Sequence, residues 1–299
     1  MRRGKRLLAV LLPMVLLLCG CGEISVHQKQ NSLKIGVVLK HPDSPYWQDM
    51  QNGMQQAALD KNVELNLLYP TGSKESQEQT VLVEDMLESD IDALIYAPVD
   101  CYDTKWIKQS ADEKEIKMLT VDDRAMDWLI PYVGTDNRTL GRMAAQFIQG
   151  QLPKGGSVLV LLGQFTQVSC KERLRGIQEQ LAVAESDYDV IDMGYSSLTE
   201  EAAYAAVMSQ EEEIGAVFCQ NVNMAQGAIA ALEEKGWDTV VVTVDTQEDG
   251  HQVLRRGKVD AIMEQDGYEI GYTAVEKAVQ AIHTGETPQD VYFSSTYVQ

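Results

Sequence analysis

The sequence predicts an α/β protein with parallel sheets that carry helices on both faces. From Leu33 onward, short apolar runs rich in β-branched residues alternate with longer stretches of helical periodicity. The runs are apolar almost throughout, which is typical of strands buried on both faces. Residues 119–122 (LTVD) and 242–245 (VTVD) both end an apolar run in Thr-Val-Asp. This echo between the two halves indicates two similar lobes.

Each expected element follows from this alternation. Helices are expected at residues 45–60, 73–88, 104–113, 138–151, 169–181, 199–209 and 224–235. Strands are expected at residues 34–39, 63–69, 93–97, 117–121, 157–162, 188–193, 216–219, 240–244 and 261–263. Pro45 suits the first turn of its helix, where a missing N–H leaves no bond unmade. The cycle restarts after residues 134–137 (GTDN), which is where the two halves of the chain divide.

The N-terminus predicts export and lipid anchoring. Basic residues precede an apolar run at residues 7–18, which is shorter than the roughly 20 residues that span a bilayer core. The LCGC that ends this segment resembles the bacterial lipoprotein cleavage box, in which a cysteine is acylated and becomes the new N-terminus. We expect residues 1–20 to be a signal peptide, Cys21 to be lipidated and residues 21–32 to be a tether. An ordinary signal peptide with an accidental cysteine is the alternative.

Composition excludes several functions. A formal net charge of −20 repels nucleic acid phosphates, so no nucleic acid partner is expected. Cys101, Cys170 and Cys219 are an odd number without a C-x-x-C pair, and we expect small buried thiols. The four histidines are far apart and none has metal-ligand spacing with a cysteine, so no metal or other cofactor is expected. No catalytic motif is present, and the chain is not expected to be an enzyme.

Polar and aromatic side chains follow several expected strands, at the sheet edge where open α/β proteins bind ligands. The candidates are Tyr46, Trp47, Asp100, Asp122, Arg124, Asn221, Asp245 and Gln265. Carboxylates and amides exchange hydrogen bonds with hydroxyl groups, and aromatic rings can lie against the apolar face of a sugar. A neutral polyol needs this combination. Core packing of the two aromatic residues and capping by the two aspartates of the Thr-Val-Asp strands are alternatives. Asn137 is expected to be a helix N-cap.

Six motifs in order resemble the periplasmic sugar-binding proteins of ABC importers, of the ribose-binding type. They are residues 44–47 (SPYW), 120–122 (TVD), 134–137 (GTDN), 171–177 (KERLRGI), 220–221 (QN) with 224–228, and 244–245 (VD). The resemblance implies a type I periplasmic binding protein fold: two Rossmann-like lobes joined by a three-segment hinge, with crossings near Thr135, Gln265 and residues 292–294. The N-terminal lobe would comprise residues 33–135 and 266–291, and the C-terminal lobe residues 136–265 and 292–299.

The same resemblance implies ligand contacts from Tyr46, Trp47, Asp122, Asn221, Asp245 and Gln265. Three positions depart from the pattern. Lys171 stands where the pentose binders have an arginine, Asp123 stands where a contact arginine follows the aspartate, and Val222 replaces an acidic residue. We therefore add Lys171 as a candidate, together with Arg124, which could supply the missing guanidinium from one residue further on. These departures leave the identity of the sugar open, because arginine and lysine are not equivalent at a bidentate site.

The function that the resemblance implies is a solute receptor in the cell envelope. It would be a monomer, anchored as a lipoprotein to the outer face of the cell membrane or on the periplasmic side. It would capture a sugar-like ligand between its lobes and deliver it to an ABC permease and ATPase complex. The alternative with the same fold is a sensor that presents its closed form to a histidine kinase or a chemoreceptor.

Overall fold

The computed structural model describes residues 32–40, 44–71, 75–126, 129–195, 197–244, 254 and 257–299. Residues 32–299 form one compact unit. The expected signal peptide, Cys21 and nearly all of the tether lie outside the described residues, and so does Asp245. None of the described helices has the length and apolar character needed to cross a membrane.

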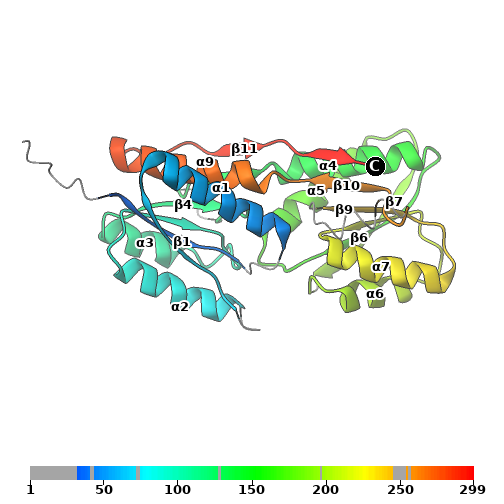
Figure 1. The fold of residues 1–299 in the computed structure, drawn as a ribbon. Coiled ribbons are helices and arrows are strands. Elements are labelled where there is room, and N and C mark those ends of the chain that lie inside the picture. Colours follow the sequence, from blue (N-terminus) through cyan, green and yellow to red (C-terminus); the bar gives the residue numbers. More distant parts are fainter. Residues whose placement is uncertain are drawn as a thin grey trace, which may run out of the picture. The chain divides into compact units, whose positions relative to one another are not determined.

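The first sheet belongs to the N-terminal lobe (Figure 1) and is entirely parallel, with the order β11-β5-β4-β3-β1-β2. Its strands are β1 (Lys34–Val38), β2 (Glu64–Leu68), β3 (Ala93–Tyr96), β4 (Lys117–Val121), β5 (Tyr132–Thr135) and β11 (Val291–Phe293). Helices α1 (Pro45–Lys61) and α9 (Gly267–Thr284) cover one face, and α2 (Glu75–Glu88) and α3 (Lys105–Glu113) cover the other. The strands are therefore buried on both sides.

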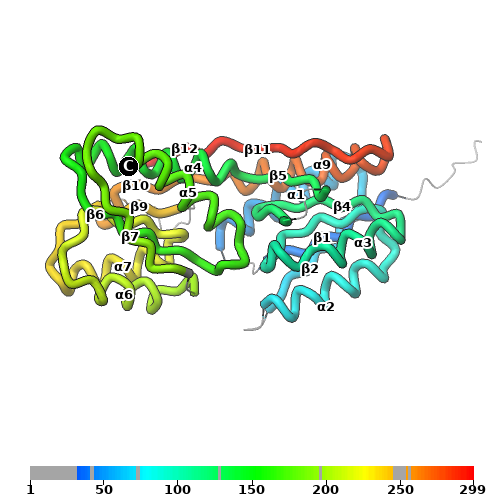
Figure 2. Tube along the Cα trace, turned by 180° about the vertical axis from the view of Figure 1, so that it is seen from behind, coloured from blue at the N-terminus to red at the C-terminus, as the bar shows by residue number. Residues whose placement is uncertain are grey.

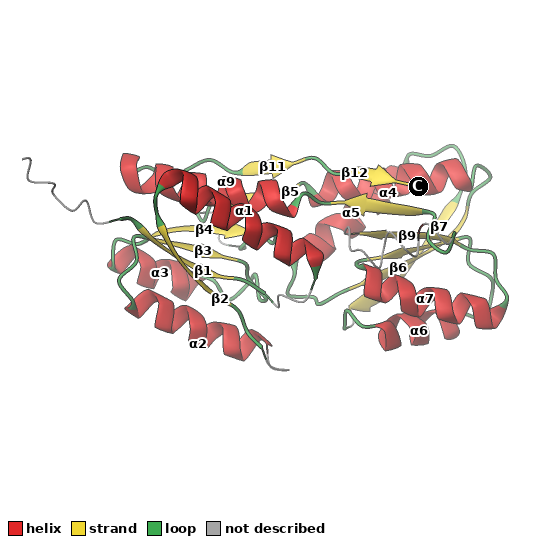
Figure 3. Cartoon of the chain, in the orientation of Figure 1, coloured by secondary structure: helices red, strands yellow, loops and turns green. Residues whose placement is uncertain are grey.

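The second sheet belongs to the C-terminal lobe and has the order β12-β10-β9-β8-β6-β7. Its strands are β6 (Gly156–Leu162), β7 (Tyr188–Tyr195), β8 (Ala216–Cys219), β9 (Val240–Val244), β10 (Ala261–Glu264) and β12 (Thr296–Val298), of which β12 is antiparallel. Helices α4 (Asn137–Gln151) and α5 (Val168–Ala182) cover one face, and α6 (Glu200–Met208) and α7 (Val222–Lys235) cover the other. Figure 3 shows this layering, with red helices on both sides of the yellow strands.

The predicted fold class is confirmed, and the expected helices and strands lie within a few residues of their predicted bounds. The sequence analysis did not place β5, α9, β11 and β12. Strands β5, β11 and β12 are only three or four residues long, too short for an alternating pattern to stand out. They pair in the sheets because the rest of each lobe already provides a strand edge.

The chain passes between the lobes after β5, after β10 and after β11. Figure 2 follows the last of these passages in red, from β11 to β12. Tyr292 and Phe293 pair with β5 in the first sheet, so the lobe boundary expected at residue 292 falls at Ser294–Ser295 instead. The first passage also corrects an expectation. Asp136 is the N-cap of α4 and accepts a hydrogen bond from the Thr139 N–H at 3.0 Å, whereas Asn137 is the first residue of the helix.

The three cysteines of the described part, Cys101, Cys170 and Cys219, are free and buried, which confirms the expected small thiols. Burial raises the pKa of each thiol, because the uncharged form is favoured where water is excluded. These thiols therefore resist ionisation at neutral pH.

Helices α4 and α5 cross at two glycines that permit close backbone contact. A Cβ atom on Gly141 would lie 2.1 Å from the carbonyl oxygen of Arg173, and one on Gly176 would lie 2.1 Å from the carbonyl oxygen of Arg138. A side chain at either position would force the helices apart. The crossing thus fixes the place of Arg173, which matters for the site described below.

We predict that Gly141→Ala lowers the free energy of unfolding by about 1–3 kcal/mol, the usual range for overpacking. Gly150→Ala in the same helix is the matched control, because nothing lies within 4 Å of its Cβ position. It should be neutral or should stabilise the protein by up to about 1 kcal/mol, because alanine is the better helix former. Urea unfolding measures both. Equal effects of the two substitutions would contradict the close crossing.

Candidate functional site

A cavity of about 380 Å³ lies between the two lobes, at the carboxyl ends of their strands. Its size falls in the range of small-molecule sites. We call it the interlobe cavity. It is lined by Lys40, Ser44, Tyr46, Trp47, Glu75 and Asp122 from the N-terminal lobe, by Gln265 from a passage between lobes, and by Gln164, Gln167, Ser169, Cys170, Arg173, Leu198, Gln220, Asn221 and Asn223 from the C-terminal lobe. Five of the predicted site residues are thereby brought together: Tyr46, Trp47, Asp122, Asn221 and Gln265.

Asp122 is the most strongly fixed side chain of the N-terminal wall. It follows β4 with a φ of 62°, in the left-handed region, which aspartate tolerates better than most residues. Its Oδ1 accepts a hydrogen bond from the Tyr46 hydroxyl at 3.0 Å, and its Oδ2 accepts one from Lys40 Nζ at 2.8 Å. The Tyr132 hydroxyl donates to its backbone carbonyl at 3.0 Å. The carboxylate is thus presented to the cavity in one orientation, and it is the N-cap of none of the helices whose caps lie in the described residues.

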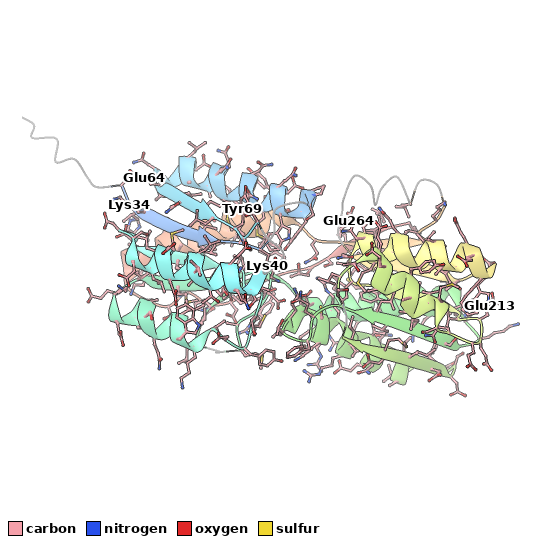
Figure 4. All side chains as sticks on the ribbon, turned by 90° about the horizontal axis from the view of Figure 1, so that it is seen from below. Lys34, Lys40, Glu64, Tyr69, Glu213 and Glu264 are labelled. Carbon is pink, nitrogen blue, oxygen red and sulfur yellow. The ribbon has the colours of Figure 1, made fainter. Side chains whose placement is uncertain are left out.

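Lys40 follows β1 and provides the positive charge of this wall. Figure 4 shows it on the side of its lobe that faces the other lobe. Its Nζ also lies 3.4 Å from Oδ2 of Asp123, a carboxylate that is fully buried. Burial by itself lowers the pKa of Lys40, but the negative charges of Asp122 and Asp123 outweigh burial, and the pKa is raised. Lys40 is therefore an ammonium group at neutral pH.

The two aromatic residues at the start of α1 serve different purposes. Tyr46 is only 4 % exposed, and its ring packs in the core, as the core-packing alternative expected. Its hydroxyl donates a hydrogen bond to the Asp122 carboxylate. Trp47 is partly buried and packs against that core. The two rings meet edge to face, with centroids 5.3 Å apart. Trp47 is therefore the aromatic side chain with ring surface available to a ligand.

Arg173, on α5, is the centre of the C-terminal wall and was missed by the sequence analysis. Three amide oxygens accept hydrogen bonds from its guanidinium: Nε donates to Asn137 Oδ1 at 2.8 Å, Nη1 to Gln220 Oε1 at 2.9 Å and Nη2 to Gln265 Oε1 at 3.0 Å. Within the described residues no carboxylate pairs with it. Among the described residues, the guanidinium is thus held in place by neutral amide dipoles.

The amide nitrogens of two of these residues extend this arrangement. Gln265 Nε2 donates to the Thr135 hydroxyl at 2.7 Å, which joins the first passage between lobes to the second. Gln220 is only 3 % exposed, and its Nε2 has no hydrogen-bond partner among the described residues. A buried donor without a partner is costly, and a ligand oxygen in the cavity would satisfy it.

Asn221 caps a helix and also lines the interlobe cavity, and the capping role was not predicted from the sequence. Its Oδ1 accepts a hydrogen bond from the Met224 N–H at 2.8 Å and so caps α7, while the residue lines the interlobe cavity. Asp245, the remaining predicted contact of this lobe, lies outside the described residues.

The structure places Arg124 and Lys171 away from the interlobe cavity, which corrects both expectations. Arg124 pairs with Asp290, with Nη2 2.6 Å from Oδ2, and Lys171 Nζ lies 4.4 Å from the ring centroid of Tyr102. Both line a second cavity of about 570 Å³. The cause in α5 is helical geometry, because residues two apart point about 200° from each other. Only one of Lys171 and Arg173 can therefore face the interlobe cavity.

A signal for Arg173 was present in the sequence. Ser169, Arg173, Gly176 and Ile177 share the i, i+4, i+7, i+8 spacing of one helix face, and all four are buried. An arginine on a buried helix face needs hydrogen-bond or ionic partners there. Lys40 gave a weaker signal, as a charged residue directly after the apolar run of β1. Nothing in the sequence distinguished it from an exposed strand-end lysine.

Comparison with known proteins identifies the family. A family model described as "Periplasmic binding protein domain" matches residues 35–287. The chain belongs to this family. It is 26 % identical over 253 residues to the ribose import binding protein RbsB of Bacillus subtilis, covering 83 % of this chain and 81 % of that protein. It is 25 % identical to the D-allose-binding periplasmic protein of Escherichia coli, covering 84 % and 85 %. The resemblance drawn from the six motifs is confirmed.

Solved structures agree on the fold. An ABC transporter solute-binding protein from Actinobacillus succinogenes with bound D-allose has a TM-score of 0.80 at 23 % identity, covering 90 % of this chain and 98 % of that one. One from Bacillus halodurans with bound myo-inositol has a TM-score of 0.79 at 23 % identity, covering 90 % and 94 %. The chain is accordingly a binding protein and not an enzyme.

The raised pKa of Lys40 predicts a pH-dependent contribution to stability. The folded protein holds this proton more tightly than the unfolded chain, whose pKa is near the ordinary 10.5. Lys40 therefore contributes its full stability below that pH and loses it as the pH rises further. We predict that the difference in unfolding free energy between wild type and Lys40→Met shrinks by about 1.4 kcal/mol from pH 8 to about one unit above 10.5. Urea titrations at both pH values measure it, and a constant difference would contradict the ion pair.

Proposed function

We propose that this protein is the solute-binding receptor of an ABC importer and that its ligand is a small, neutral sugar or sugar-like polyol. The observation that carries the proposal is the wall of the interlobe cavity. It presents a carboxylate, an ammonium group, a guanidinium and side-chain amides from two lobes to one small space.

The chemistry of the wall suits hydroxyl groups, which donate and accept hydrogen bonds at once. Asp122 supplies acceptors, while Lys40, Arg173 and Gln220 Nε2 supply donors. Trp47 offers a flat apolar surface for the C–H face of a sugar ring. A stereoisomer with one hydroxyl misplaced would leave a buried donor or acceptor unpaired, so such a wall discriminates between sugars. Asp245 stays part of the proposed site.

Relatives support the transport assignment. Those that the chain matches over more than four fifths of their length include ribose import binding proteins and D-allose-binding proteins. They favour delivery to an importer over the alternative of a sensor. A ligand that bridges both lobes binds the closed state better than the open one, so binding shifts the population toward closure. The closed receptor would then be what the permease recognises.

The proposed receptor is a monomer held in the cell envelope by lipid on Cys21, after removal of residues 1–20. Each buried methylene contributes roughly 0.8 kcal/mol, so several acyl chains would hold it at the membrane.

A thermal shift screen tests the ligand class. Residues 32–299, the compact unit that contains every described helix and strand, would be heated with pentoses, hexoses, their phosphates and polyols. Ribose, D-allose and myo-inositol come first, because the relatives and solved structures described above are named for these ligands. A ligand at 100 times its dissociation constant should stabilise the protein by about 2.7 kcal/mol. No shift with any neutral polyol, or a shift only with phosphates, would contradict the proposal.

With a ligand in hand, we predict that Arg173→Lys weakens binding by about tenfold or more, because lysine cannot hold three amides in a plane. Arg175→Lys on the same helix is the matched control, since Arg175 lines the second cavity instead. It should leave the affinity unchanged. Titration calorimetry measures both dissociation constants. Equal losses, or none, would remove Arg173 from the ligand site.

For the anchor, we predict that Cys21→Ser moves the exported protein from the membrane fraction to the soluble fraction, because the acylated side chain is lost. Cys19→Ser is the control and should remain membrane-bound. Fractionation with metabolic fatty-acid labelling reads out both variants. A membrane-bound, labelled Cys21→Ser protein would contradict lipidation at this residue.

A further inference from the structure

The carboxylate of Asp123 has hydrogen-bond partners in both lobes. It is fully buried and does not line the interlobe cavity. Within its own lobe, Oδ1 accepts from the Arg124 N–H at 3.0 Å, and Oδ2 lies 3.4 Å from Lys40 Nζ. From the other lobe, the Ser169 N–H donates to Oδ1 at 2.9 Å and the Ser169 hydroxyl donates to Oδ2 at 2.8 Å. One carboxylate of the N-terminal lobe therefore holds the first turn of α5.

Two neighbouring contacts also join the lobes without a ligand. The Cys101 N–H donates to the Thr166 carbonyl at 3.1 Å, and the Thr166 hydroxyl donates to the Val99 carbonyl at 3.1 Å. We call this set of contacts, made by Val99, Cys101, Asp123, Thr166 and Ser169, the interlobe latch. Its partners are backbone groups and short side chains, which lose little rotamer freedom when they are fixed.

The latch lies next to the interlobe cavity. Ser169 lines both the interlobe cavity and the second cavity, and Asp123 lines only the second. Lys40 bridges Asp123 to Asp122 on one side, while α5 carries Arg173 one turn beyond Ser169 on the other. Asp123 thus sets the distance between the two charged walls of the interlobe cavity.

Separation of the lobes would remove the two Ser169 donors from a buried anion. Hydrogen bonds to a charged group are stronger than neutral ones, and a negative charge is favourable at a helix N-terminus. The joined arrangement therefore has a source of stability that does not depend on any ligand.

We propose that Asp123 is a positioning residue that holds the two walls of the interlobe cavity together before ligand arrives, so that the ligand-free protein has a large closed population. This role rests on the proposed function, because the apparent affinity for the ligand equals the intrinsic affinity multiplied by the closed fraction. A residue outside the cavity would then tune ligand binding. The latch itself is measured without any sugar.

The experiment uses residues 32–299 with Gln77→Cys on α2 and Glu201→Cys on α6, both exposed positions in different lobes. The three native thiols are buried, so spin labels attach to the two introduced cysteines. Pulsed electron paramagnetic resonance then gives the distance distribution between lobes in the absence of ligand. We expect wild type to populate the distance of the latched arrangement.

Asp123→Asn places an amide N–H₂ against donors, and we expect it to lower the ratio of closed to open protein by about tenfold or more. Ser169→Ala removes only the hydroxyl donor and should lower it by a few fold, which keeps the test available if Asp123→Asn fails to fold. Asp92→Asn is the matched control, because the Asp92 carboxylate accepts from the Lys34 N–H of its own lobe at 2.7 Å, at the amino ends of the strands. It should leave the distribution unchanged.

A ligand-free wild type that is wholly open would overturn the proposal. So would closed populations unaffected by both latch substitutions, or reduced equally by Asp92→Asn. Loss of closure in Asp123→Asn and Ser169→Ala together with a failed sugar screen would retain the latch and reject only the ligand class. If wild type binds a sugar but shows no closed state in the absence of ligand, the ligand class is retained and the latch is rejected.

Discussion

The proposed ligand site depends on the fixing of Arg173 by three neutral amides. Asn137, Gln220 and Gln265 come from α4, from the end of β8 and from a passage between lobes, and each accepts one hydrogen bond from the guanidinium. The three acceptors are neutral, so they orient the guanidinium by hydrogen bonds, and no carboxylate among the described residues pairs with it. The close crossing of α4 and α5 at glycines makes this geometry possible. A cation held in this way is preorganised for ligand oxygens, and its ordering is complete before binding.

On the N-terminal wall of the cavity, the cation is paired with carboxylates and not with amides. Lys40 is placed between two carboxylates, and only Asp122 faces the cavity, while Asp123 is withdrawn to contact the other lobe. A buried charge is tolerated when it is paired and hydrogen-bonded, and the Lys40 ammonium group pairs with both carboxylates. The same cluster therefore joins β1 to the end of β4, presents a donor and an acceptor to the interlobe cavity, and reaches α5.

Individual residues show which parts of the fold and of the candidate site could be predicted from the sequence. The apolar runs and helical periods predicted both sheets, and the strand-end rule predicted that Trp47, Asp122, Asn221 and Gln265 would meet. The same rule failed for Arg124, which lies two residues after Asp122 but turns toward Asp290 and Tyr292. The left-handed φ of Asp122 redirects the chain at this point, and no local pattern encodes that turn.

The sequence by itself determined the α/β class, the order of elements and the edge of each sheet where a ligand would bind, because these follow from periodicity and from the common direction of parallel strands. Only the tertiary structure decided which positively charged side chain lines each wall of the interlobe cavity. Lys40 and Arg173 took the places expected of Arg124 and Lys171. That choice depends on which side of a helix or turn a side chain leaves and on partners more than thirty residues distant in the chain, such as Asp122 for Lys40 and Gln265 for Arg173.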